Sequence, residues 1–123
     1  MSQRMLGFAV VLAAGLGCLV EWERAQARRV DDAVMALRTA QFAPTTRARL
    51  GTWFRAVEPN TQLTWRAEPT RLMDDRTVVE LVTRAGEETR VYRFSVDIDD
   101  RDARPLDAAT EALVKRVTRW ALP

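Results

Sequence analysis

The longest apolar stretch of the chain covers residues 5–20, from Met5 to Val20, and contains no charged or strongly polar side chain. Its sixteen residues would extend about 24 Å as an α-helix, somewhat less than the roughly 30 Å hydrocarbon core of a bilayer. Local thinning of the bilayer, with Trp22 at the headgroup level, makes up the difference at a modest cost. The pattern therefore predicts an N-terminal transmembrane helix over residues 1–20, of the signal-anchor type, in contact with the lipid bilayer.

Two other interpretations of the same stretch stay open. A basic start followed by an apolar run also describes a cleaved secretory signal, and Ala25-Gln26-Ala27 has the small-x-small form of a cleavage site. The charged residues between that site and the apolar run count against cleavage. Alternatively, Gly17 precedes the only cysteine, Cys18, as a small residue does in a lipoprotein. Gly15 stands where lipoprotein signals usually carry leucine, which counts against lipid modification.

The orientation of the anchor is predicted from the charges on either side of it. Four arginines follow the stretch within about twenty residues, whereas only Arg4 and the α-amino group precede it. Counted by the positive-inside rule, this favours a cytoplasmic C-terminal domain. A four-residue lead is typical of a signal-anchor, however, and both other interpretations export the domain. We expect a single-pass membrane protein with an extracytoplasmic, periplasmic domain.

Behind the anchor, apolar positions recur first at helical and then at alternating spacing. Residues 21–43 form a predicted juxtamembrane amphipathic helix that continues from the anchor, because neither Gly nor Pro interrupts it before residue 44. A short second helix is predicted from Leu50, Trp53, Phe54 and Val57, with hydroxyl N-caps offered by the threonines before it. Alternation then predicts strands over residues 61–68, 77–83 and 89–98, and it places Tyr92, Phe94, Val96 and Ile98 on one face of the third.

The chain ends in a predicted helix over residues 106–120, so residues 44–123 form one small domain. Short loops between the strands imply a three-stranded antiparallel meander, and the fold class is α+β. Trp65 is expected to pack beneath the C-terminal helix, against Leu113 and Val117 and beside Tyr92 or Phe94. In outline this order of elements is similar to membrane-anchored domains of cystatin-like or NTF2-like shape, a likeness that implies no residue roles.

Composition narrows the range of functions. With 123 residues there is room for one domain behind the anchor. The formal net charge is +2, which is not the profile of a nucleic-acid-binding protein. The chain has no histidine, and its only serines are Ser2 and Ser95, so the usual general base and serine triad are missing. We therefore predict no enzyme and no catalytic, cofactor-binding or metal-binding residues.

Three groups of side chains have the composition of possible sites, and ordinary structural roles are expected for each. The carboxylates of Asp97, Asp99, Asp100 and Asp102 are expected to form a solvated strand-to-helix turn with helix-capping residues, because the loop lacks the glycine and final acid of an EF-hand. Arg66, Arg90 and Arg93 are expected on a charged outer sheet face rather than in an anion site. The tryptophans are expected in the core rather than in a ligand groove, namely Trp22, Trp53, Trp65 and Trp120.

The function expected from these observations is that of a membrane-anchored accessory or scaffold protein. Its small α+β domain would bind a protein partner in a cell-envelope assembly. The alternative is a lipid- or small-ligand-binding module that uses a groove between helix and sheet.

Overall fold

The computed structural model describes residues 2–68 and 76–123, with side chains from residue 20 onward apart from that of Trp22. The chain is α+β, as predicted, and its described part has three α-helices and a four-stranded antiparallel sheet. In chain order the elements are α1 (Ser2–Thr39), the 3-10 helix η1 (Thr46–Ala48), α2 (Leu50–Val57), β1 (Gln62–Ala67), β2 (Arg76–Ala85), β3 (Glu88–Asp97), β4 (Asp102–Pro105) and α3 (Ala108–Ala121).

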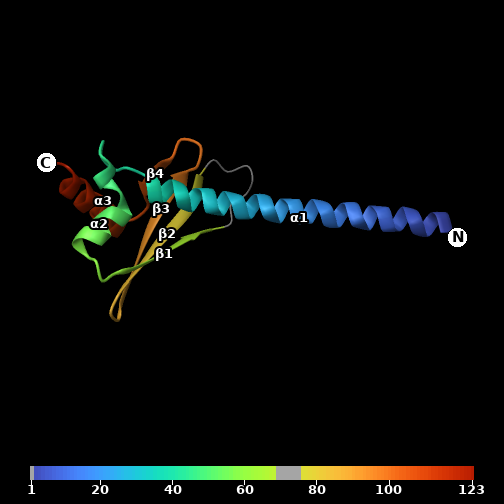
Figure 1. Cartoon of the computed structure of the whole chain (residues 1–123), viewed down its shortest axis with the longest axis horizontal. Helices are drawn as coiled ribbons and strands as arrows, with labels where there is room; N and C mark the ends of the chain where they lie inside the picture. Colours follow the sequence, from blue (N-terminus) through green and yellow to red (C-terminus); the bar gives the residue numbers. More distant parts are fainter. Residues whose placement is uncertain (1, 69–75) are drawn as a thin grey trace.

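Helix α1 is a long rod that projects away from the other elements, which gather at its C-terminal end (Figure 1). It runs unbroken from Ser2 to Thr39, so residues 5–20 and the residues that follow them belong to one helix. The side chains of the predicted anchor lie outside the described residues, except that of Val20. Among the residues that are described, no helix is long and apolar enough to cross a membrane.

The sheet has the strand order β1-β2-β3-β4, and all neighbouring strands are antiparallel. The turn between β2 and β3 places Gly86 at a φ of 62°, a left-handed conformation that glycine adopts without steric cost. Side chains alternate between two faces along each strand. One face is buried and carries the predicted inward residues of β3, which are Tyr92, Phe94 and Val96.

The prediction of three strands is wrong, because residues 102–105 form a fourth strand that pairs with β3. These residues, Asp-Ala-Arg-Pro, carry too little apolar character to show alternation. Pro105 lacks a backbone donor and is tolerated because β4 lies at the edge of the sheet. The chain reverses into β4 through Arg101, whose φ is 52°. The turn that begins at Asp97 was expected to lead into the C-terminal helix, and it leads instead into strand β4.

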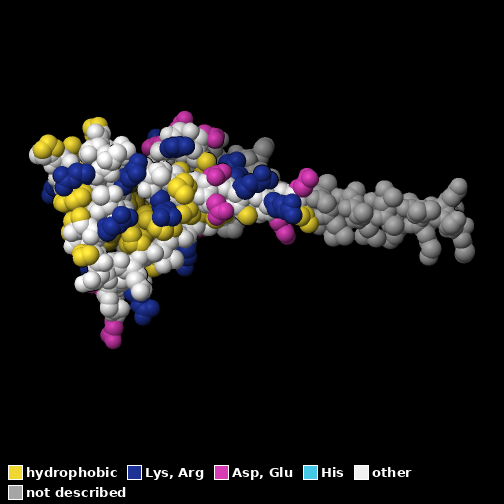
Figure 2. Space-filling view, in the orientation of Figure 1, with side chains coloured by type: hydrophobic (Ala, Val, Ile, Leu, Met, Phe, Trp, Pro, Cys, Tyr) yellow, Lys and Arg dark blue, Asp and Glu magenta, His cyan; other side chains and the backbone are white. Residues whose placement is uncertain are grey.

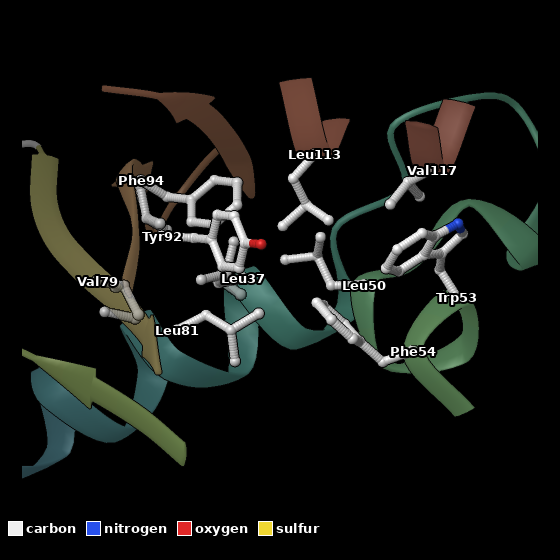
Figure 3. Close-up of a cluster of buried hydrophobic side chains, with 13 residues drawn as sticks. Leu37, Leu50, Trp53, Phe54, Val79, Leu81, Tyr92, Phe94, Leu113 and Val117 are labelled. Atoms are coloured by element: carbon white, nitrogen blue, oxygen red, sulfur yellow. The ribbon is translucent and has the colours of Figure 1, made fainter. Parts of the chain in front are cut away.

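Helices α1 and α3 pack on the buried face of the sheet, and α2 packs beside α3 and reaches that face through Phe54, which contacts Tyr92. The other face is open to solvent, as far as the described residues show. Helix α1 contributes Ala33, Ala36 and Leu37 to this core. The predicted apolar face of α2 is confirmed for Leu50, Trp53 and Phe54, whereas Val57 is exposed. Figure 3 shows the buried side chains of α2 pointing toward Tyr92 and Phe94 of β3 and toward Leu113 and Val117 of α3.

The hydroxyl caps fall on other elements than expected. Thr45 caps η1, since its side chain accepts a hydrogen bond from the backbone N–H of Arg47. Helix α2 begins after Arg49, which makes no side-chain cap. Helix α3 begins after Asp107, whose carboxylate accepts a hydrogen bond from the backbone N–H of Thr110 at 2.8 Å. The start of α3 is thus fixed by a carboxylate at its N-cap, which also lies at the positive end of the helix dipole.

Candidate functional site

Strand β1 lies at the edge of the sheet, and its outer edge is unpaired in the described part of the chain. The backbone N–H of Glu68 donates to the carbonyl of Val78 in β2 at 3.0 Å. Because hydrogen-bonding direction alternates along an antiparallel strand, the N–H and C=O groups of the odd-numbered residues point away from β2. The free edge therefore presents the backbone groups of Leu63, Trp65 and Ala67.

Two hollows lie beside this strand and meet at Arg38 and Trp65, which line both. The polar hollow, of about 310 Å³, lies between α1, α2 and β1 and is lined by arginines, Glu58 and Leu63. The apolar hollow, of about 580 Å³, lies between α1 and β1 and is lined by Val30, Val34, Met35 and Ala67 among others. Figure 2 shows basic side chains interspersed with hydrophobic ones where α2 meets the end of α1. We call the two hollows together the β1 groove.

Trp65 stands at the centre of the β1 groove, and the prediction that it packs beneath the C-terminal helix is wrong. Helix α3 contacts β3 and β4, at the other side of the sheet. The ring of Trp65 instead lies near α1, with the guanidinium carbon of Arg38 at 5.9 Å from its centroid. Leu81 stands between Trp65 and Tyr92 in the strand register. Alternation places Trp65 on the correct face but does not show which helix covers that edge.

The arginines of the polar hollow have no carboxylate partner among the described residues. Arg38, Arg49 and Arg55 line it, and none of them takes part in an ion pair found among the described residues. The Nε atom of Arg49 is buried and has no hydrogen-bond acceptor within that part of the chain. Glu58 is the single acid among the described residues of the lining. The hollow therefore carries an excess of positive charge.

The arginines predicted on the outer sheet face are, by contrast, paired. Arg66 contacts Glu80 at 3.1 Å, and Arg93 lies 3.4 Å from the same carboxylate group. Arg90 contacts Glu88 at 2.7 Å, and this hydrogen bond raises the pKa of Arg90 above its usual range. Arg66 and Arg93 lie on the outer sheet face beside Glu80, as predicted. The prediction is wrong for Arg90, which shares the face of Tyr92 because its register partner is the buried Thr83.

Two carboxylates of residues 97–102, those of Asp97 and Asp102, have partners within the described part of the chain. The Oδ1 atom of Asp97 accepts hydrogen bonds from the backbone N–H groups of Asp99 and Asp100 at 3.0 and 3.2 Å. Asp102 pairs with Arg76 at 3.2 Å and with Arg104 at 3.0 Å. In the described part of the chain, no group of acidic residues has an arrangement that could hold a metal ion.

The other tryptophans differ from Trp65. Trp53 is buried in the core, as expected, with its ring edge-on to that of Phe54 at 4.8 Å. Trp120 is half-buried, and the guanidinium carbon of Arg47 lies 4.5 Å from its ring centroid. The side chain of Trp22 lies outside the described residues. Only Trp65 among the described tryptophans lines the β1 groove.

The chemistry available in the β1 groove is that of recognition. Guanidinium groups bind carboxylates through paired hydrogen bonds, an indole ring offers a large apolar surface with one donor, and a free strand edge pairs with another strand. Sequence reasoning did not find the arginine group, because Arg38 lies at the end of α1 whereas Arg49 and Arg55 belong to the start and the last turn of α2. No protein-family model, curated protein or solved structure matches this chain.

Proposed function

We propose that this protein is a membrane-anchored accessory or scaffold subunit whose α+β domain binds an extended segment of a protein partner along β1. The observation that carries the proposal is the edge of β1 that no described strand pairs with, where Leu63, Trp65 and Ala67 present their backbone groups. A partner segment that adds to this edge gains main-chain hydrogen bonds, and side-chain pockets beside the edge supply specificity.

The side chains of the same residues favour this mode of binding. Leu63, Trp65 and Ala67 are half-buried in the free domain, so a partner strand would complete the covering of their apolar surface. Partly exposed tryptophans beside a hollow are typical centres of binding energy in protein interfaces. Met35 of α1, at the rim of the apolar hollow, is 55% exposed and can adapt its shape to a partner side chain.

The remaining parts of the proposal concern the position of the domain. The uncharged residues 5–20 would hold the protein in the membrane, with the domain on the extracytoplasmic side. Helix α1 has 38 residues and so a length of about 57 Å, which would place the domain beyond the headgroups. A domain at that height suits an accessory role in a cell-envelope assembly.

A lipid- or small-ligand-binding module is the rival function, and the apolar hollow favours it. Its volume of about 580 Å³ falls in the usual range of ligand sites. A lipid chain there would contact Val30, Val34 and Met35 of α1. The arginines of the polar hollow and the free strand edge would then have no part in binding, which is why the protein-binding function is preferred.

The test is purification of the full chain from its native membranes in mild detergent, with a C-terminal tag. We expect a stoichiometric protein partner with the unchanged chain. The partner should be lost with Trp65→Ala and with Ala67→Pro. Proline removes an outward-facing backbone donor that the partner strand would use, and an edge strand tolerates this loss without unfolding. Val91→Ala, on the exposed outer face, is the control and should retain the partner.

Two outcomes would contradict this function. A partner that all variants retain would show that binding does not use β1. A lipid found by mass analysis in place of a protein, and lost only with substitutions in the apolar hollow, would support the ligand-binding module instead. Thermal unfolding of each variant, measured in the same detergent, shows whether loss of the partner reflects loss of the fold.

A further inference from the structure

We infer that Arg38, Arg49 and Arg55 form a receptor for one acidic side chain. The partner segment paired with β1 would then carry an aspartate or glutamate at the position beside the polar hollow. This inference rests on the proposed function and adds the chemistry of the partner. The three arginines line the polar hollow together with a single acid among the described residues, Glu58. An aspartate or glutamate in this hollow would partly neutralise their excess charge.

The positions of the arginines fix the receptor in space. Arg38 lies in the last turn of α1, Arg49 directly precedes α2, and Arg55 lies within α2. Both helices pack on the core through other residues, so the backbone that carries the three guanidiniums is already fixed in the free domain. A fixed backbone limits the entropy that is lost on binding to the ordering of the arginine side chains.

Arg49 supplies the strongest evidence for a missing acceptor. Its Nε atom is buried without an acceptor in the described part of the chain. A buried donor of a charged group is unfavourable unless an oxygen meets it. The arginines of the sheet surface meet such oxygens within the chain, as Arg66 does with Glu80 at 3.1 Å. At Arg49 the acceptor is left for a partner to supply.

The continuity of the hollow with β1 favours an acidic side chain over a free anion. Leu63 and Trp65 of the strand line the same hollow as the arginines. In a strand paired with β1, alternate side chains point to the helix-covered face and lie about 6.6 Å apart. One such side chain would enter the polar hollow, and the next on that face would enter the apolar hollow at Ala67 and Met35. The expected partner pattern is therefore acidic, any residue, apolar, in either chain direction.

The experiment uses the full chain in detergent micelles and a set of acetylated, amidated decapeptides of alternating threonine and valine. Each member carries one glutamate, with leucine two positions away, and the pair is moved through the sequence. Matched peptides carry glutamine in place of glutamate, or N-methyl groups on the backbone. We expect at least one glutamate peptide to bind at least about tenfold more tightly than its glutamine match, and N-methylation to abolish binding.

Variants of the chain locate the charge effect. Arg49→Gln and Arg55→Gln should lower the affinity for the glutamate peptide to that for the glutamine peptide, and should leave the affinity for the glutamine peptide unchanged. Arg119→Gln, on the exposed side of α3, is the matched control and should preserve the preference. Raising the salt concentration should reduce the preference for glutamate and leave the glutamine peptide little affected.

The two proposals fail in different ways. Equal affinity for the glutamate and glutamine peptides, with both lost in Trp65→Ala, would overturn the acidic receptor and leave the strand-binding function standing. Binding of acetate or inorganic phosphate alone as tightly as the peptide would also overturn it, because the hollow would then be a small-anion site. Failure of every peptide to bind would overturn both proposals.

Discussion

The guanidinium of Arg38 lies over the ring of Trp65, with its carbon 5.9 Å from the ring centroid, and this contact divides the β1 groove into its polar and apolar hollows. A cation over an aromatic face is attracted by the negative face of the ring's quadrupole. The contact holds the indole against α1 and leaves its outer surface open to the groove. Trp65 is therefore positioned both to complete the fold and to receive a partner.

Trp65→Ala tests how these two roles are divided. Because the side chain is only half-buried, we expect a loss of unfolding free energy of about 1 to 2 kcal/mol, measured by denaturant titration of the full chain in micelles. Phe94→Ala, in the fully buried core, should lose about 3 to 5 kcal/mol. Arg66→Ala, in an exposed ion pair, should change stability by about 0.5 kcal/mol or less. A loss for Trp65→Ala as large as that for Phe94→Ala would place the ring in the core.

The carboxylate of Asp107 should make the domain sensitive to acid. Hydrogen bonds from the side chain and then the backbone of Thr110 lower the pKa of Asp107 below its usual value. A lowered pKa in the folded state means that the contribution to stability is present above the unfolded pKa of about 3.9 and is lost as pH falls through the folded pKa. Asp107→Ala should therefore be less stable than the unchanged chain at pH 7, by about 1 kcal/mol.

Measurement of unfolding against pH separates the cap from its charge. The difference between the unchanged chain and Asp107→Ala should shrink as the pH falls below about 4. Asp107→Asn keeps an N-cap acceptor that does not titrate, so its stability should vary less over the same range. A difference that is the same at pH 7 and at the acid end would show that the ionised carboxylate contributes nothing.

The N-terminal anchor is tested by extraction and intact mass. Because residues 5–20 carry no charge, the protein should stay in the membrane pellet after high-salt and alkaline washing, with its N-terminus retained. Loss of residues 1–27 would show a cleaved signal, and loss of residues 1–17 with added lipid would show attachment at Cys18. A reporter that is active only outside the cytoplasm, fused after Pro123, should be active if the domain is exported.

Much of the fold follows from local patterns, and the exceptions have physical reasons. Alternation predicted the buried face of β3 because Tyr92, Phe94 and Val96 lie on a sheet with one dry side. Strand β4 was missed because an edge strand of four residues can be polar and can contain Pro105. The helical spacing of Leu50, Trp53 and Phe54 predicted α2 correctly, because these residues also form one buried face.

The candidate site could not be predicted in the same way, because it depends on which helix covers which strand. The period of β1 showed that Trp65 faces inward, but its neighbour in space is Arg38, a residue far away in the chain. The polar hollow collects Arg49 and Arg55 from another segment. In the sequence these arginines look the same as Arg66, and only the structure shows that Arg66 is paired.

Thr110 offers the sharpest test of how α3 is attached to the sheet. It is fully buried; its hydroxyl donates to Asp107 at 2.6 Å and accepts from the backbone N–H of Arg93 at 2.9 Å. Thr110→Val keeps the shape but removes both bonds, and leaves the N–H of Arg93 without its acceptor. We expect a loss of about 1 to 3 kcal/mol, against little change for Thr89→Val on the exposed end of β3. Thr110→Ser should recover much of this loss, because it restores the hydroxyl. If Thr110→Val and Thr110→Ser were equally stable in denaturant titrations, the hydroxyl would not connect α3 to β3.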